Sequence, residues 1–228
     1  MKTMLNNIKF VFFDVDDTIF DFDKCGEKVI KDAFGKFSLP YSATVFPTFK
    51  TINKGFWKRI EKGEIDRDYL SAHRFNAVFA DLGINFDGPT FEKEFLRGLH
   101  YACEEVDGAI ETVRSLSKKY PLFVASNAFY EQQINRLSLA GIADCFKDVF
   151  VSEKMGCNKP SPEFFAKMLA LAGVDKPETA LMVGDSLEAD IIGAKNAGMK
   201  TFWLTDKNGD EHADVTSPDI TLLSKILL

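Results

Sequence analysis

From residue 107 onward, the chain alternates between short apolar runs and longer segments whose apolar residues recur at three- and four-residue intervals. Short apolar runs bounded by polar residues or glycine predict buried strands, and the longer periodicity predicts helices. The strands predicted in this part of the chain are residues 122–125, 149–151, 180–183 and 201–204, and a further strand is predicted near the amino terminus at residues 8–13. The predicted helices are residues 131–140, 162–172 and 187–197. This alternation predicts an α/β fold built on a parallel sheet.

Residues 21–106 have a different pattern. They contain no clear strand signal and several amphipathic stretches with helical period, such as residues 51–62 and 68–81. We therefore expect an all-helical insertion between the first and second strands. The α/β core is then discontinuous in sequence and comprises residues 1–20 and 107–228.

Composition and charge narrow the class of partner. The chain has 228 residues, 46% of them hydrophobic, a formal net charge of -6 and a pI near 5.2. Binding to a nucleic acid polymer depends on clustered Lys and Arg, so the acidic balance argues against it. A small anionic substrate is compatible with this charge if the site has a local positive centre, such as a metal ion or a few lysines.

The four cysteines and the amino-terminal segment bear on location. The cysteines form no C-x-x-C pair, and we expect reduced thiols. The apolar run at residues 8–13 is too short for a signal peptide or a membrane span. We therefore expect a cytoplasmic protein with no membrane partner.

Polar side chains follow four of the predicted strands, at or soon after the point where each strand ends. They are Asp14 and Asp16, Ser126 and Asn127, Lys159, and Asp185 and Asp190. The carboxyl ends of parallel strands form the crevice where ligands bind in open α/β sheets. We therefore expect these four loops to converge on one site.

The carboxylates of this set predict a metal site. Asp14, Asp16 and Asp17 crowd within four residues at a strand end, and such groups repel one another unless a cation or proton is present. Mg²⁺ prefers oxygen ligands and uses one or two carboxylates together with substrate phosphate. Asp185 is the expected ligand from a second strand, supported by Asp190 one helical turn further on. The alternative is that both clusters only cap turns and helices.

The remaining polar residues fit an anionic substrate. The Ser126 hydroxyl and the Asn127 amide are suited to donate to phosphate oxygens, although a plain turn cap is the alternative. Lys159 lies in a loop with prolines at positions 160 and 162, and it is suited both to relieve carboxylate repulsion and to bind an anion. A solvated lysine is its alternative.

Taken in order, these motifs resemble those of the haloacid dehalogenase superfamily. They are Asp14-x-Asp16-x-Thr18, Ser126-Asn127, Lys159-Pro160 and Gly184-Asp185-(x)4-Asp190. The resemblance implies a Rossmann-like core with an inserted helical cap. It also implies that Asp14 is a nucleophile that forms an aspartyl-phosphate and that Asp16 is the general acid and base. Mg²⁺ is then held by Asp14, the backbone carbonyl of Asp16 and Asp185, while Ser126, Asn127 and Lys159 bind the phosphoryl group.

Two segments resemble, more narrowly, the bacterial pyrimidine 5′-nucleotidase branch of this superfamily. They are residues 13–22 and 51–65. This resemblance implies a small phosphorylated metabolite as substrate, namely a nucleoside monophosphate. Aromatic side chains that could stack on its base are Phe20, Phe22, Phe56 and Trp57. Their alternative role is packing inside the cap.

Other functions remain open at this point. Within the superfamily they are a phosphatase of phosphoglycolate or of sugar phosphates, a phosphomutase, and a 2-haloacid dehalogenase. The last is disfavoured because dehalogenases generally lack the second aspartate, which is present here as Asp16. Outside the superfamily, a non-enzymatic receiver-like module also combines an acidic cluster, an aspartate and a lysine, but such modules have no large helical insertion.

Overall fold

The computed structural model describes residues 5–207, 209 and 211–228 of the chain. It divides into two compact units, one formed by Met1–Phe22 with Cys103–Leu228 and the other by Asp23–Ala102. We call them the core unit and the helical unit. The predicted boundaries, after residue 20 and before residue 107, lie within a few residues of these.

The core unit is built on one parallel sheet, as predicted. Its strands are β1 (Phe10–Phe13), β2 (Leu122–Ser126), β3 (Phe146–Val151), β4 (Ala180–Gly184), β5 (Lys200–Leu204) and β6 (Val215–Ser217), in the spatial order β3-β2-β1-β4-β5-β6. Val11 pairs with Leu122 on one side and with Leu181 on the other, so β1 is central. The order reverses beside β1, and ligands of such sheets bind outside the carboxyl ends of the strands at that switch point.

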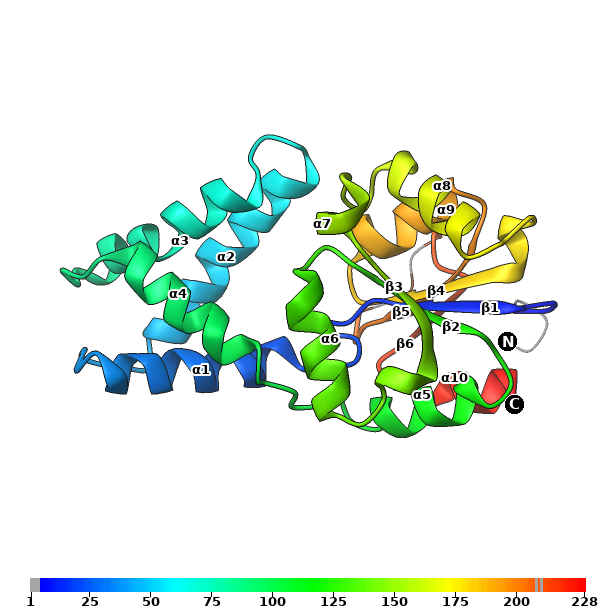
Figure 1. Ribbon diagram of the computed structural model, residues 1–228, viewed down its shortest axis with the longest axis horizontal. Coiled ribbons are helices and arrows are strands. Elements are labelled where there is room, and N and C mark those ends of the chain that lie inside the picture. The colour runs from blue at the N-terminus through cyan, green and yellow to red at the C-terminus, as the bar shows by residue number, and fades with distance from the viewer. Residues whose placement is uncertain (1–4, 208, 210) are drawn as a thin grey trace. The chain divides into compact units, whose positions relative to one another are not determined.

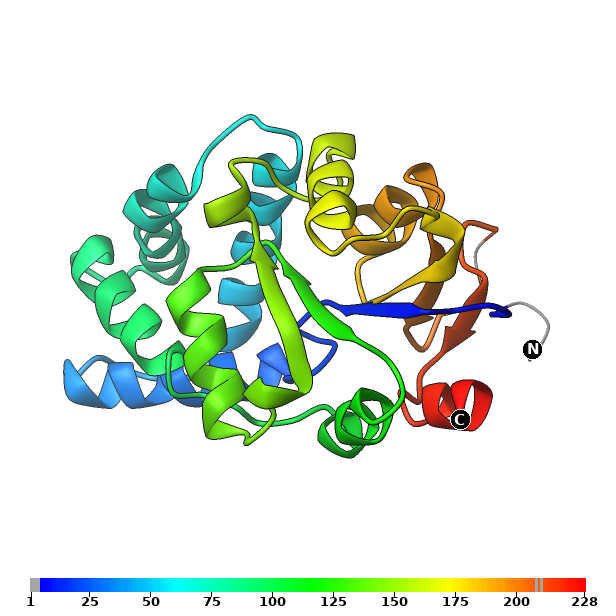
Figure 2. The same cartoon turned by 45° about the vertical axis from the view of Figure 1, so that its right-hand side comes forward.

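Helices cover both faces of the sheet (Figure 1). One face packs against α5 (Ala109–Ser117), α6 (Tyr130–Leu139) and α10 (Leu222–Leu227), and Figure 2 shows α5 and α10 side by side there. The other face packs against α8 (Pro162–Leu171) and α9 (Gly193–Asn196).

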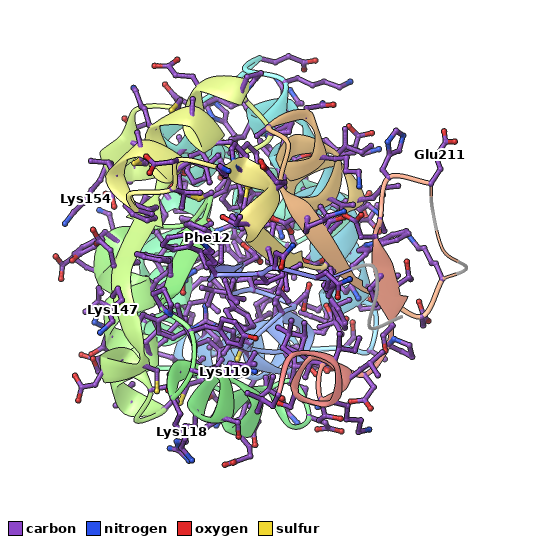
Figure 3. The ribbon with its side chains drawn as sticks, turned by 90° about the vertical axis from the view of Figure 1, so that its right-hand side faces the viewer. Phe12, Lys118, Lys119, Lys147, Lys154 and Glu211 are labelled. Atoms are coloured by element: carbon purple, nitrogen blue, oxygen red, sulfur yellow. The ribbon has the colours of Figure 1, made fainter. Side chains whose placement is uncertain are left out.

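Alternate residues of β1 enter different cores, because successive side chains of a strand point to opposite faces. Val11 and Phe13 belong to the first cluster, and Phe12 belongs to the second. Phe12 stacks on Phe123 with ring centroids 4.9 Å apart. Figure 3 shows Phe12 in the interior of this unit, whereas the side chain of Lys147 points outward.

The predicted elements of the core unit differ from the observed ones in several places. β3 begins at Phe146, three residues earlier than expected, and the edge strand β6 was not predicted. The predicted helix at residues 187–197 is a π-helical turn, η3 (Leu187–Ile192), followed by α9. A short helix, α7 (Ser152–Met155), follows β3 directly.

The helical unit contains the predicted insertion, and within residues 23–102 it has no strand. Its helices are α1 (Phe22–Lys36), which begins in the core unit, α2 (Val45–Glu61), α3 (Arg67–Leu82) and α4 (Gly88–Leu99). Packed phenylalanine rings fill its interior, for example Phe75 and Phe91 with centroids 4.5 Å apart. A buried ion pair, Arg74–Glu92 at 2.5 Å, lies among them. Within the described residues, the helices are too short or too polar to cross a membrane.

Candidate active site

The predicted site residues of the core unit lie at one edge of the sheet. Asp14 follows β1, Ser126 ends β2, Asp185 follows β4, and Lys159 lies in the loop between α7 and α8. Their proximity follows from the parallel sheet, because every strand presents its carboxyl end to the same edge.

Lys159 is the centre of the contacts. Its Nζ donates to Asp14 Oδ1 at 2.7 Å, to Asp190 Oδ1 at 2.6 Å and to the carbonyl oxygen of Ala125 at 2.6 Å. These three acceptors match the three donors of an ammonium group, and the side chain is 2% exposed. Burial disfavours its charge, but the carboxylates of Asp14 and Asp190 outweigh this effect and raise the pKa of Lys159 above its usual value. Lys159 is therefore a buried, charged lysine and not a solvated one.

Three carboxylates form the acidic cluster of the site. Asp14, Asp185 and Asp190 each offer an oxygen, and these oxygens lie within 4.8 Å of one another. Burial raises the pKa of Asp14 to about 8 against the opposing charge of Lys159, and the negative charge of Asp190 adds to the rise. Burial and the neighbouring charge of Asp190 also raise the pKa of Asp185. One lysine does not offset three carboxylates, of which Asp14 and Asp190 are buried and Asp185 is half-buried, so the cluster has a charge deficit that a divalent cation would fill.

The donor set fits Mg²⁺, which is a hard ion with a preference for carboxylate and carbonyl oxygens. Asp14 and Asp185 are the side chains best placed to hold it, since both carboxylate oxygens of Asp190 are already bound, one by Lys159 and the other by the backbone N–H of Ser186. The participation of the Asp16 backbone carbonyl stays a prediction.

Asp190 is closer to the centre than the sequence suggested. Its Oδ2 accepts from the backbone N–H of Ser186 at 3.1 Å, so the side chain folds back over the start of η3. This contact requires glycine at position 184, because a Cβ there would lie 2.3 Å from Asp190 Oδ2. Gly184 thus allows β4 and the Asp190 side chain to approach closely.

Asp16 faces away from the lysine. Its Oδ1 accepts from Arg136 Nη1 at 2.6 Å, and its Oδ2 accepts from Gln133 Nε2 at 2.8 Å. Both partners come from α6 and are fully buried. Sequence reasoning missed them, although their i,i+3 spacing places them on one face of a helix that follows a site loop.

Trp203 of β5 was also missed. Its Nε1 donates to the backbone carbonyl of Asp185 at 2.8 Å, and its side chain is almost fully buried. A buried indole N–H normally finds an acceptor, and here that acceptor fixes the backbone of a candidate metal ligand.

Ser126 and Asn127 make contacts within the protein. Ser126 Oγ accepts from the backbone N–H of Ala128 at 3.1 Å. The Asn127 amide donates to the carbonyl of Lys159 at 3.0 Å and accepts from the Lys159 N–H at 2.9 Å. Asn127 therefore holds the Lys159 loop against β2, and the phosphate-binding roles of both residues stay predictions.

The four aromatic residues differ in exposure. Phe20 is fully buried, and the guanidinium carbon of Arg136 lies 4.7 Å from its ring centroid. Its ring is part of the core of the core unit and is not available to a base in this structure. Phe22, Phe56 and Trp57 are partly exposed, and base stacking by them stays a prediction.

Comparison with known proteins identifies the family. Residues 8–198 match the model of the haloacid dehalogenase-like hydrolases. The chain is 31% identical to the pyrimidine 5′-nucleotidase PynA of Streptococcus pneumoniae over 90% of this chain and 86% of PynA. It is 30% identical to the pyrimidine 5′-nucleotidase YjjG of Escherichia coli over 85% of this chain and 84% of YjjG.

A solved structure is similar over nearly the whole chain. The HAD-hydrolase YfnB of Bacillus subtilis, in a structure bound to magnesium, has a TM-score of 0.91 at 31% identity and covers 97% of this chain and 99% of its own. The predicted resemblance to this superfamily and to its pyrimidine 5′-nucleotidase branch is thereby confirmed, as is the Rossmann-like core with a helical insertion. The chain belongs to the haloacid dehalogenase-like hydrolase family.

Proposed function

We propose that the protein is a Mg²⁺-dependent phosphomonoester hydrolase that forms an aspartyl-phosphate on Asp14. The observation that carries this proposal is the placement of Asp14 at the end of the central strand, bound by Lys159 within the acidic cluster. A second carboxylate, Asp16, lies two residues further on and is held separately by α6. A nucleophile and an acid–base group with separate environments are what stepwise phosphate ester hydrolysis requires.

The first half-reaction transfers the phosphoryl group. A carboxylate oxygen of Asp14 forms a bond to phosphorus while the ester oxygen of the substrate departs in line. Asp16 gives its proton to that departing oxygen, which leaves as an alcohol. Lys159 keeps Asp14 oriented through its hydrogen bond to Oδ1.

The second half-reaction returns the enzyme. A water molecule attacks the phosphorus of the aspartyl-phosphate, and Asp16 accepts a proton from it. The bond between phosphorus and the Asp14 oxygen breaks, which releases inorganic phosphate and regenerates the carboxylate. Asp14 and Asp185 would hold the Mg²⁺ ion, which would supply positive charge that lowers the repulsion between the nucleophile and the anionic substrate.

We propose pyrimidine nucleoside monophosphates as the substrate class. Support comes from the similarity to PynA and YjjG, both pyrimidine 5′-nucleotidases, over most of the chain. Phosphoglycolate or a sugar phosphate is the alternative. Dehalogenation has less support, because Asp16 provides the proton that an alkoxide leaving group needs and a halide does not. The cytoplasmic location stays a prediction, consistent with these substrates.

Two experiments test this proposal. In the first, turnover of an aryl phosphate is measured with and without Mg²⁺ for the wild type, Asp14→Asn and the control Asp148→Asn. Asp148 is exposed on β3, so its variant should keep wild-type turnover. We expect Asp14→Asn to abolish turnover, and full activity in that variant would exclude the mechanism. In the second, a panel of phosphorylated metabolites is compared by kcat/KM, and faster turnover of sugar phosphates than of nucleotides would exclude the substrate assignment.

A further inference from the structure

Asp16 is bound by two side chains of α6 that have no place in the mechanism above. Arg136 binds one carboxylate oxygen and Gln133 binds the other, and these residues lie 120 and 117 positions away in the sequence. An ionised carboxylate has about four lone-pair directions on its two oxygens, of which these bonds use two. Each oxygen therefore keeps one direction for proton exchange while both are held by α6.

The two α6 side chains are themselves fixed. Arg136 Nη1 also donates to Gln133 Oε1 at 3.2 Å, and the guanidinium lies over the ring of Phe20. Phe20 pairs with Asp16 in a short backbone bridge, and its carbonyl accepts from the N–H of Asp17 at 2.8 Å. The Phe20 ring and the Asp16 carboxylate, which both contact Arg136, therefore belong to the same short loop. This connection restricts the conformations that both groups can adopt.

Gln133 also connects this arrangement to the end of β2. Its Nε2 lies 3.4 Å from Ser126 Oγ, at the long end of hydrogen-bond distance, while the same nitrogen donates to Asp16 at 2.8 Å. Gln133 and Arg136 are both fully buried, which is unusual for such side chains unless their polar groups are satisfied. A buried arginine is well suited to holding a carboxylate in one orientation, because its planar guanidinium group presents its donors in a fixed arrangement.

We infer that Arg136, assisted by Gln133, is a positioning residue that orients the Asp16 carboxyl group for proton transfer to the leaving group. This inference rests on the proposed function of Asp16. Loss of Arg136 leaves Asp16 chemically intact but free to adopt other rotamers. The value of kcat/KM should then fall strongly for substrates whose leaving group needs a proton. It should fall much less for substrates whose leaving group departs as a stable anion.

The test compares two esters, an alkyl phosphate and p-nitrophenyl phosphate, by kcat/KM in saturating Mg²⁺. This parameter reports the steps up to transfer of the phosphoryl group, which is where the leaving group departs. Because general acid catalysis contributes about 10²–10⁴-fold, we expect Arg136→Met to lower kcat/KM about 100-fold for the alkyl ester and less than about tenfold for the aryl ester. Arg136→Lys should restore part of the alkyl activity, since it keeps a charged donor.

Two further variants separate positioning from a structural role. In an Asp16→Asn background, Arg136→Met should change kcat/KM by less than about threefold, because the group that it orients is already absent. Arg114→Met is the matched control, since Arg114 donates to the carbonyls of Ala140 and Gly141 just after α6 and has no bond to Asp16 in the structure. It should leave the ratio of the two esters unchanged. Folding of each variant is checked by circular dichroism, and Gln133→Leu takes the place of Arg136→Met if the latter does not fold.

The outcomes are distinguishable. An equal loss on both esters, or a full further loss in the Asp16→Asn background, would overturn the inference while leaving the proposed function standing. A wild type that hydrolyses neither ester would overturn the proposed function itself.

Discussion

Lys159 offers a quantitative test of the site's electrostatics, independent of any substrate. Replacing it with methionine keeps most of the side-chain volume but removes three hydrogen bonds from one ammonium group. It also leaves Asp14 and Asp190 as buried carboxylates without their cation. Removing one partner of a buried ion pair costs about 3–5 kcal/mol. Three charge-assisted bonds at about 1.5–3 kcal/mol each would sum to more than this, but protonation of Asp14, whose pKa is already raised to about 8, limits the loss.

The free energy of unfolding is measured by urea titration in a chelator, so that metal binding does not contribute. A chain with two compact units can unfold in separate steps, so the probe must report on the core unit. Trp203 lies in the core unit and Trp57, the other tryptophan, lies in the helical unit. A Trp57→Phe background thus gives a fluorescence signal from the core unit alone. We expect Lys159→Met to lose about 3–5 kcal/mol and the exposed control Lys147→Met to change by less than about 0.5 kcal/mol.

A double-mutant cycle makes this prediction stricter. Asp190→Asn removes one of the two charges that Lys159 neutralises, so it should be costly in the wild type and less costly, or even stabilising, after Lys159→Met. We expect a coupling energy of about 0.5–3 kcal/mol. A loss below about 1 kcal/mol for Lys159→Met, or strict additivity in the cycle, would refute the view that Lys159 is the counter-ion of this cluster.

Three other predictions address the rest of the molecule. Among the residues that the structure describes, Thr18 Oγ1 is buried without a hydrogen-bond partner, so Thr18→Val should keep or raise the free energy of unfolding by up to about 1 kcal/mol; a clear loss in urea titration would show that the hydroxyl is bonded. Hydrogen bonds from Arg97 and Lys36 lower the pKa of Glu94 to about 2 from 4.5. The stability that Glu94 contributes is therefore complete above pH 4.5 and lost as the pH falls towards 2, and the Tm difference between wild type and Glu94→Gln should shrink over that range; a constant difference would contradict it. Mg²⁺ at 100 times its Kd should stabilise the wild type by about 2.7 kcal/mol, and an equal effect on Asp185→Asn would remove Asp185 from the metal site.

The fold was largely predictable because buried parallel strands leave a strong signal in sequence. The five predicted strands are mostly apolar runs, which is what a sheet covered by helices on both faces requires. β6 was missed because Val215-Thr216-Ser217 is only three residues long, is polar at two of them and lies at the edge of the sheet. The π-helical turn at η3 was missed for a different reason. Its geometry depends on the Asp190 side chain folding back on Ser186, a contact that apolar periodicity does not report.

The residues of the site also differ in whether the sequence alone carries a signal for them. Asp14, Lys159 and Asp185 were predicted as site residues because polar residues directly after buried strands, or in the loops between them, are exceptions to the surrounding pattern. Arg136 and Trp203 were not, because an arginine within a helix and a tryptophan within a strand are ordinary at those positions. Their roles arise from contacts across the fold, 120 residues apart for Arg136 and Asp16 and 18 residues apart for Trp203 and Asp185. Only the folded chain brings such pairs together.

The division of charge between two cations explains how Asp14 and Asp16 can lie two residues apart at the end of a buried strand. Successive side chains of an extended segment point to opposite sides, so alternate positions would place both carboxylates on the same side. Asp14 nevertheless pairs with Lys159 and Asp16 with Arg136 of α6, so the two carboxylates bind different cations. Each carboxylate thus has its own counter-ion and its own hydrogen-bond partners. In the proposed mechanism one carboxylate binds the phosphoryl group and the other exchanges protons, and separate cations allow the two groups to be positioned independently.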